Sequence, residues 1–227
     1  MKYVLLTGAS GGLGVKLSEY LLQKGYYVIM LYHTHKDEVE ELHRKYKNGM
    51  VYQIDLTKDD EILELKKYLN DYDINIDILI NNAAIDNTCD INDKTKESFM
   101  SVFELNAYVP YKLMKEISFK TCVNISSENA IDTYDSVSLE YDISKASLNM
   151  LSNIFRLIYP DRVINTICFG WLDTKMNKID DDMKKYIEFV PFDKAVKEIE
   201  KLFNENKDIV VVRKWSYECC ICTYTFL

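Results

Sequence analysis

Two patterns of hydrophobic and polar positions alternate along this chain. Short apolar runs rich in Val, Ile and Tyr are separated by longer segments in which apolar residues recur every three or four positions, as Leu13, Leu17 and Leu21 do. The first pattern is typical of buried strands and the second of amphipathic helices. Strands are therefore predicted at residues 2–7, 27–32, 50–54, 76–80, 120–126, 162–168 and 208–213.

The order of these elements predicts the fold class. A helical segment between one strand and the next is the pattern of strand–helix–strand units built around a parallel sheet. The chain contains only three prolines and seven glycines, and no internal repeat or low-complexity linker interrupts it. We therefore expect one doubly wound α/β domain over residues 1–227, with a seven-stranded parallel sheet.

Composition and charge narrow the classes of function. The chain has 227 residues, of which 48% are hydrophobic, enough for one sizeable core. Its net charge of -8 and pI near 5.0 disfavour nucleic acid as a partner, although backbone dipoles can still hold a small cofactor that carries phosphates. The first apolar run is too short for a signal peptide or a membrane span, so a cytoplasmic protein without a membrane partner is expected.

The six cysteines do not indicate a disulfide scaffold or a metal centre. Cys122 and Cys168 fall inside predicted strands, where a thiol packs as a small hydrophobic group. Cys219 and Cys222 have the spacing of a metal or redox pair, but no second pair and no histidine lies near them in the sequence. We expect a packed tail and no metal site.

The stretch TGASGGLG, from Thr7 to Gly14, lies between the first predicted strand and the first predicted helix. Glycines at such a turn let the backbone approach a pyrophosphate closely, and the N–H groups and dipole of the following helix favour its negative charge. Because the glycines have this strand-to-helix context, they predict a dinucleotide-binding site.

This loop resembles the Thr-Gly-x-x-x-Gly-x-Gly motif of the short-chain dehydrogenase/reductase family, matched by Thr7, Gly8, Gly12 and Gly14. Gly8, Gly11 and Gly14 also fit the Gly-x-x-Gly-x-x-Gly loop of the family's extended branch, the sugar epimerases and dehydratases. Members of that branch carry a further substrate domain, for which 227 residues leave no room. The resemblance therefore implies a single Rossmann fold.

Further segments resemble the family in the family's own order. Asp55 has the place of an aspartate that contacts adenine, and NNAA, ending at Ala84, resembles Asn-Asn-Ala-Gly. NTICFGWLDTKM resembles the segment that lies along the nicotinamide, with Phe169 where a proline is usual and with Gly170, Thr174 and Met176 matching. The resemblance assigns cofactor contacts to Gly8, Ser10, Gly12, Leu13, Gly14, Tyr32, His33, Thr34, Asp55, Leu56, Asn82, Ala83, Ala84, Tyr141, Lys145, Gly170, Leu172 and Thr174.

The spacing Tyr-x-x-x-Lys occurs five times in the chain, so the spacing alone identifies no catalyst. Only Tyr141 and Lys145 follow a predicted strand that ends in serines. Ser127 lies one residue farther from Tyr141 than is usual in the family, and it matches better than Ser126 because it is the second serine. With Asn106, in LNAYVPY, these residues resemble the complete catalytic tetrad of the family.

The resemblance gives each member of the tetrad a role in reducing a carbonyl by hydride transfer. A positive Lys145 one helical turn from Tyr141 is expected to lower the pKa of that tyrosine, which then acts as general acid in reduction and as base in oxidation. Lys145 would also hydrogen-bond the nicotinamide ribose. Ser127 would orient the substrate oxygen, and Asn106 would hold a water that relays protons.

The residues after the second strand favour NADP over NAD as the cofactor. In VIMLYHTHKDE no acid precedes Asp37, whereas NAD-preferring relatives tend to have an acid there that would repel a 2'-phosphate. The segment His33–Lys36 offers donors to such a phosphate. Against this, Gly11 stands where NADP-dependent relatives often carry a basic residue, and no arginine follows Tyr32.

The leading prediction is a carbonyl reductase or alcohol dehydrogenase acting on a small molecule, with 3-oxoacyl-carrier-protein reductase as the default. The acidic patch Asp180 to Asp182 would repel an anionic carrier protein. A small uncharged or polyol-like substrate is therefore an alternative to that default. The alternative is a non-catalytic regulator or scaffold that senses the nicotinamide cofactor. Such members of the family usually lose the tyrosine or the lysine, and this chain keeps both.

A homodimer or homotetramer is expected to form through the helices that carry Asn106 and Tyr141. Apolar residues on these helices exceed what one core-facing stripe requires. They are Phe99, Phe103, Leu113, Met114, Leu148, Leu151, Ile154, Phe155 and Ile158. The alternative cover for them is the C-terminal tail of the same chain, through Trp215, Tyr217, Ile221, Tyr224 and Phe226.

Overall fold

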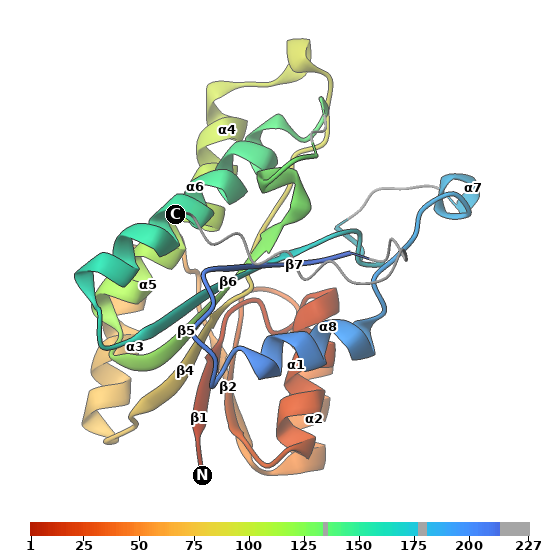
Figure 1. Ribbon diagram of the computed structural model, residues 1–227. Coiled ribbons are helices and arrows are strands. Elements are labelled where there is room, and N and C mark those ends of the chain that lie inside the picture. Colours follow the sequence, from red (N-terminus) through yellow and green to blue (C-terminus); the bar gives the residue numbers. More distant parts are fainter. Residues whose placement is uncertain (134–135, 177–180, 214–227) are drawn as a thin grey trace.

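The protein forms an open parallel β-sheet with helices packed on both of its faces (Figure 1). This computed structural model describes residues 1–133, 136–176 and 181–213. Asp180, the Cys219–Cys222 segment and the tail residues named as the alternative cover for the apolar helices lie outside the described residues.

Seven strands make up the sheet in the order β3-β2-β1-β4-β5-β6-β7, and every neighbouring pair is parallel. The strands are β1 (Tyr3–Leu6), β2 (Tyr27–Tyr32), β3 (Gly49–Gln53), β4 (Ile76–Asn81), β5 (Phe119–Ser127), β6 (Val163–Phe169) and β7 (Ile209–Val212). The predicted doubly wound, seven-stranded fold is confirmed, and the ends of the strands differ from the prediction by no more than one residue.

Helices connect the successive strands and cover the sheet in two layers (Figure 1). The α-helices are α1 (Gly12–Gln23), α2 (Asp37–Tyr46), α3 (Asp59–Asp71), α4 (Lys96–Phe103), α5 (Val109–Glu116), α6 (Leu139–Ile158), α7 (Asp181–Lys184) and α8 (Phe192–Lys201). Three shorter segments are η1 (Ile91–Asp93), η2 (Glu104–Tyr108) and η3 (Glu128–Ala130). Apolar residues of α1, α2 and α8 pack on one face of the sheet, and those of α3, α5 and α6 pack on the other.

The strands read as continuous apolar runs because both of their faces are buried. In β1, Val4 and Leu6 join the core beneath α1 and α8, whereas Leu5 between them joins the core beneath α3 and α5. All three side chains are fully buried. The alternation of side chains along each strand thus supplies both hydrophobic cores from one short sequence.

A π turn joins α4 to α5 in one continuous helical stretch. In this turn the backbone N–H of Val109 bonds to the carbonyl oxygen of Glu104, five residues back. Pro110 follows directly and has no N–H with which to continue the regular ladder. The shifted register turns Asn106, in the middle of the π turn, into the protein interior, where it is fully buried.

Four of the residues expected at the oligomer interface lie on the buried sides of α5 and α6. Leu113, Met114, Leu148 and Phe155 are buried in the core of their own chain, so they are not available to a partner. Periodicity alone did not separate core residues from surface residues on these helices. The exposed apolar residues of α6 are Ile143, Met150, Ile154, Leu157 and Ile158.

The described part of the chain contains neither a membrane span nor a metal cluster, and two of its cysteines are buried. No helix there has the length and apolar character needed to cross a lipid bilayer. Those residues also hold no group of three or more His, Cys, Asp or Glu side chains that is placed to bind a metal ion. Cys122 and Cys168 are buried thiols in β5 and β6, as predicted.

Candidate active site

A large pocket opens at the carboxyl ends of the strands, the edge at which parallel α/β sheets bind ligands. Its volume is about 1080 Å³, and its lining includes most of the glycine loop (Gly8 and residues 10–14), the ends of β5 and β6 and the segment 170–176. Every residue predicted to contact a cofactor lines this pocket, and so does Ser127. Asn106 is the exception among the predicted site residues, because it lies behind the wall of the pocket.

The glycine loop contains two glycines that admit no side chain. Gly8 has a φ of 62°, and a Cβ at this position would lie 2.8 Å from the Cα of Ala83. A Cβ on Gly14 would lie 2.1 Å from the carbonyl oxygen of Gly8. Helix α1 then begins with extended Gly11 as its N-cap and without a side-chain cap. Its first N–H groups are therefore available to an anion such as the pyrophosphate of a dinucleotide.

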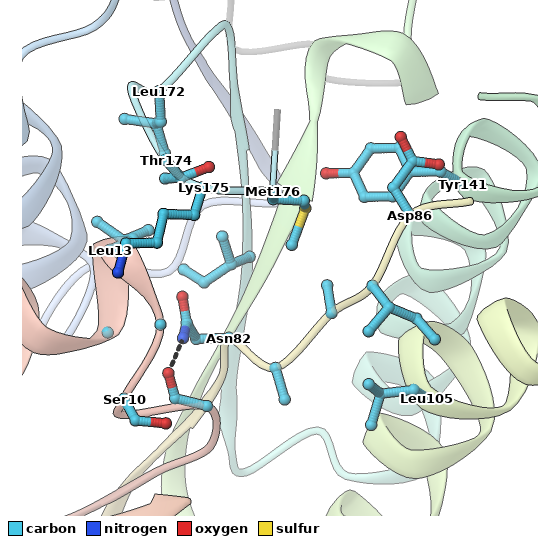
Figure 2. A pocket seen from close by; sticks show the side chains of 18 of the residues that line it. Ser10, Leu13, Asn82, Asp86, Leu105, Tyr141, Leu172, Thr174, Lys175 and Met176 are labelled. Carbon is cyan, nitrogen blue, oxygen red and sulfur yellow. Dashed lines mark hydrogen bonds between the residues drawn. The ribbon is translucent and has the colours of Figure 1, made fainter. Parts of the chain in front are cut away.

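Asn82 and Thr174 bring two other segments of the chain against this loop (Figure 2). Asn82 follows β4, and its Nδ2 donates to the carbonyl oxygens of Thr7 and Gly8, each at 3.0 Å. Thr174 packs so closely on Gly12 that a Cβ added there would lie 3.0 Å from its Cγ2. The resulting cradle of backbone amides and small side chains fits the phosphates of a dinucleotide.

Asp55, predicted to contact adenine, lines the pocket beyond the end of β3. Its Oδ1 accepts from the hydroxyl and the backbone N–H of Thr57, at 2.7 and 3.1 Å, and these hydrogen bonds hold the pKa of the carboxyl below its usual value. His33 Nε2 lies 3.9 Å from the other oxygen. Lys16 and Glu38 also line the pocket, although no motif in the sequence singled them out.

Ser127 and Tyr141 meet on the wall of the pocket. Ser127 is the last residue of β5, and Tyr141 lies in the first turn of α6. A hydrogen bond joins their side chains. Ser126 instead donates to the carbonyl oxygen of Lys145 at 3.4 Å, so the geometry selects Ser127 as the partner of the tyrosine.

Burial governs the titration of both Tyr141 and Lys145. It raises the pKa of Tyr141 above the usual value, the charge of Asp86 adds to the increase, and the hydrogen bond with Ser127 opposes it. Burial lowers the pKa of Lys145 to about 8. The Nζ of Lys145 lies 5.5 Å from the centre of the Tyr141 ring and donates to the Ile125 carbonyl oxygen at 2.8 Å.

The expected lowering of the Tyr141 pKa by Lys145 is therefore wrong for this structure. The free-energy cost of removing the Tyr141 phenolate from water exceeds the stabilisation that the Lys145 ammonium provides. That ammonium is itself desolvated, and it donates its hydrogen bond to another group. Sequence spacing identified the pair correctly but carried no information on how deeply each group is buried.

Asn106 fixes the loop after β4 to helix α6. Its Nδ2 donates to the Ile85 carbonyl oxygen at 2.8 Å and to the Ser144 hydroxyl at 3.0 Å. Its Oδ1 accepts from the Ile85 N–H at 2.9 Å. All three contacts are made to protein groups, and both amide hydrogens are committed.

The start of α6 is further held by a buried ion pair directly beside the tyrosine. Glu140, the residue before Tyr141, pairs with Lys94 and accepts from the Ser98 hydroxyl at 3.0 Å. Lys94 also donates to the carbonyl oxygens of Asn87 and Val137, at 2.9 and 3.0 Å. Tyr141 therefore stands on a helix end whose position is determined by contacts on several sides.

Phe169 ends β6 at the place where the family usually has a proline. It is in register with Ser127 on one side and with Val212 on the other. Because phenylalanine keeps the N–H that proline lacks, β6 stays paired on both sides up to the pocket. The next residue, Gly170, lies so close to Glu128 that a Cβ would come within 3.3 Å of its carboxylate.

Several charged residues of the pocket were missed from the sequence, among them Asp86, Glu128 and Lys175. Figure 2 shows the Asp86 carboxyl group beside the Tyr141 ring, and Lys175 extending toward Leu13. The Nε of Arg213 lies 2.9 Å from the Glu128 carboxylate. Asp86 and Glu128 each follow a matched motif by one or two residues, and this proximity to strand ends was the signal available.

Two relatives illustrate the sequence similarity. The short-chain dehydrogenase anuI of Penicillium roqueforti is 31% identical over 110 residues, which cover 46% of this chain and 44% of that protein. The diacetyl reductase, (S)-acetoin forming, of Staphylococcus epidermidis is 24% identical over 202 residues, or 81% of this chain and 77% of that enzyme. The chain thus spans less than half the length of the first relative and most of the second.

Solved structures of dehydrogenases share the fold. 4-Hydroxyisoleucine dehydrogenase complexed with NADH has a TM-score of 0.86 at 22% identity, covering 94% of this chain and 97% of that one. The alcohol dehydrogenase from Thermococcus sibiricus complexed with 5-hydroxy-NADP has a TM-score of 0.80 at 17% identity, covering 93% and 96%. The model of the family described as short chain dehydrogenase matches residues 2–185. The chain therefore belongs to the short-chain dehydrogenase/reductase family and is an oxidoreductase.

Proposed function

We propose that this enzyme reduces the carbonyl group of a small molecule to an alcohol, or oxidises that alcohol, with Tyr141 exchanging the proton. The observation that supports this most is the placement of Ser127, Tyr141 and Lys145 on one pocket together with the glycine loop. A nicotinamide cofactor held by that loop supplies or accepts the hydride.

Tyr141 is the proposed general acid. Its raised pKa keeps the phenol protonated at neutral pH, which is the form that carbonyl reduction requires. Ser127, hydrogen-bonded to the tyrosine side chain, would orient the substrate oxygen. Lys145, with a pKa of about 8, carries its charge at neutral pH and would bind ribose hydroxyls while stabilising negative charge near the tyrosine.

Asn106 is proposed as a positioning residue. Both hydrogens of its amide are already given to Ile85 and Ser144, so its side chain has no donor left for a water. It would act by holding the loop after β4 and the helix of Tyr141 at a fixed separation.

NADP is the proposed cofactor, in preference to NAD. His33 and Thr34 directly follow β2 and line the pocket, and no acid follows that strand until Asp37. Lys16 adds a cation to the lining, whereas Glu38 adds an acid that opposes a 2'-phosphate. The preference for NADP is therefore expected to be moderate, because Lys16 favours the 2'-phosphate and Glu38 opposes it.

A small carbonyl compound without negative charge is the substrate that we place ahead of an acyl carrier protein. Asp86 and Glu128 put carboxylates on the pocket, and Asp182 is exposed outside it, where it pairs with Lys185 at 2.7 Å. An anionic carrier or an anionic substrate would meet repulsion at each of these places. The reductase of 3-oxoacyl-carrier-protein remains the second candidate, on family resemblance.

Turnover separates this function from cofactor sensing without catalysis. Purified protein would be screened with NADPH and NADH against a panel of small ketones and aldehydes, following the loss of reduced cofactor. Turnover that disappears in Tyr141→Phe is expected. Tight cofactor binding with no turnover of any carbonyl would favour the sensing role instead.

Self-association is proposed through the exposed apolar face of α6. Ile143, Met150, Ile154, Leu157 and Ile158 expose between 42% and 84% of their surface there, and Met100 on α4 exposes 52%. A helix with apolar residues on a second side is expected to bury them against a partner.

A further inference from the structure

Asp86 places a carboxylate at the reacting end of the pocket. It follows Ile85, whose backbone is bracketed by Asn106, and it lines the pocket together with Tyr141 (Figure 2). Its charge is the second cause, after burial, of the raised Tyr141 pKa, so the two groups interact electrostatically as well as sharing the pocket.

The two oxygens of this carboxylate differ. Oδ2 accepts from the Ser138 hydroxyl at 2.8 Å and from the Thr88 hydroxyl at 3.1 Å. Oδ1 is shielded from solvent and accepts no hydrogen bond from any described residue. Within the described ranges, Asp86 also forms no ion pair. A buried acceptor without a partner is unfavourable, and for a carboxylate the cost is larger than for a neutral group.

This charge opposes the proposed reaction of a plain ketone. Carbonyl reduction moves negative charge onto the substrate oxygen, and it takes a proton from Tyr141. A carboxylate beside both groups raises the energy of that transition state. The opposition is removed when the substrate itself brings a hydrogen-bond donor or a positive charge to the carboxylate.

We propose that Asp86 recognises a hydroxyl or ammonium group next to the reacting carbonyl, so that the substrates are α-hydroxy or α-amino carbonyl compounds. This inference rests on the proposed carbonyl chemistry at Tyr141. A donor that approaches the carboxylate from the pocket would offset its charge, whereas a carboxylate or phosphate at the same position would be repelled.

Four other charged groups of the pocket are paired, bonded or directed elsewhere. Glu128 is already bonded to Arg213. Asp173 pairs with Lys184 at 3.3 Å. Lys145 donates to the Ile125 carbonyl oxygen. Lys175 extends toward Leu13, away from the tyrosine (Figure 2).

The test compares four three-carbon ketones with and without the charge of Asp86. Acetone, hydroxyacetone, aminoacetone and pyruvate would be assayed with wild type and Asp86→Asn, whose amide oxygen still accepts from Ser138 and Thr88. Wild type is expected to favour the two donor-bearing ketones over acetone by about tenfold or more in kcat/KM. Asp86→Asn should lose most of that preference and should turn over acetone and pyruvate faster than wild type.

A matched control and a binding measurement make each outcome decisive. Asp173→Asn also removes a carboxylate from the pocket lining, but one that is already paired, and it should keep the wild-type preference. Calorimetric titration of 1-amino-2-propanol and of 2-propanol, with oxidised cofactor present, reports recognition without turnover. A larger effect of Asp86→Asn on the turnover of aminoacetone than on that of hydroxyacetone would identify the cation as the preferred donor.

Equal losses for all four ketones in a correctly folded Asp86→Asn, or a wild type without preference in either assay, would overturn the role of Asp86. No turnover of any ketone, together with Asp86-dependent binding of the amino alcohol, would instead refute the proposed carbonyl chemistry and leave the recognition intact. Unfolding midpoints in urea confirm that the variants are folded.

Discussion

The side-chain amide of Asn106 pairs with the backbone of Ile85 as one strand residue pairs with another, donating at 2.8 Å and accepting at 2.9 Å. A third bond, to the Ser144 hydroxyl, extends the contact into α6. One fully buried side chain from a π turn thus joins the loop that carries Asp86 to the helix that carries Tyr141.

Asn106→Ala is expected to destabilise the protein by roughly 2–4 kcal/mol, because it removes the two hydrogen bonds to the Ile85 backbone and the buried hydrogen bond to the Ser144 hydroxyl. The value of kcat should fall as well, since the tyrosine helix and the Asp86 loop lose their common anchor. Urea unfolding and steady-state kinetics measure the two effects. Asn75→Ala, at an exposed position before β4, is the control and should change neither. Full stability in Asn106→Ala would show that these bonds contribute little.

Tyr141→Phe should keep the fold and the cofactor affinity but lose about a hundredfold or more in kcat, because only the exchangeable proton is removed. Tyr108→Phe is the matched control. Tyr108 also stands four residues before a lysine, but its hydroxyl bonds the surface carboxylate of Asp59 at 3.0 Å. A Tyr141→Phe enzyme with wild-type turnover would remove Tyr141 from the mechanism.

The buried Lys145 makes stability depend on pH in a defined direction. Its pKa is lowered from 10.5 to about 8, so below pH 8 both the folded and unfolded states bind the proton and the full cost of burying the cation is present. Between pH 8 and 10.5 the unfolded state still binds the proton that the folded state has lost, and this cost disappears as pH rises.

Wild type should therefore gain stability relative to Lys145→Met over this range, by on the order of 3 kcal/mol in the free energy of unfolding. Urea titrations of both proteins near neutral pH and near the upper end of the range supply the comparison. A difference between the two proteins that stays constant with pH would mean that Lys145 keeps its ordinary pKa.

Cofactor preference is expected to follow the charges after β2. His33→Asp should weaken NADPH binding by about tenfold and leave NADH binding nearly unchanged, because the new carboxylate repels only the 2'-phosphate. Glu38→Gln should have the opposite sign and strengthen NADPH binding. Fluorescence titration measures both affinities. Tighter binding of NADH than of NADPH by wild type would overturn the proposed preference.

The apolar face of α6 should hold the assembly together. Light scattering at micromolar concentration is expected to give a dimer or a tetramer of the 26.6 kDa chain, and Leu157→Asp should shift it toward the monomer because Leu157 is 84% exposed on that face. Leu63→Asp, on exposed apolar surface of α3, is the control and should leave the mass unchanged. A wild type of monomer mass would refute self-association.

The sequence by itself determined the order of strands and helices, the glycine loop and the pairing of Tyr141 with Lys145. These features depend on local patterns: strands buried on both faces need continuous apolar runs, and a turn with a φ of 62° at Gly8 favours glycine. The placement of Ser127 at the end of β5 also followed from the sequence alone, because the apolar pattern of that strand ends in two serines.

Only the tertiary structure decided how these groups behave. The pKa of Lys145, the unpartnered oxygen of Asp86 and the bracket of Asn106 on Ile85 all depend on residues distant in sequence, which meet when β4, β5 and α6 pack together. The same holds for the faces of α5 and α6, where Leu113 and Phe155 are core and Leu157 is surface. Periodicity identifies an apolar helix, but desolvation and pairing are properties of the packed neighbours, which the local sequence does not specify.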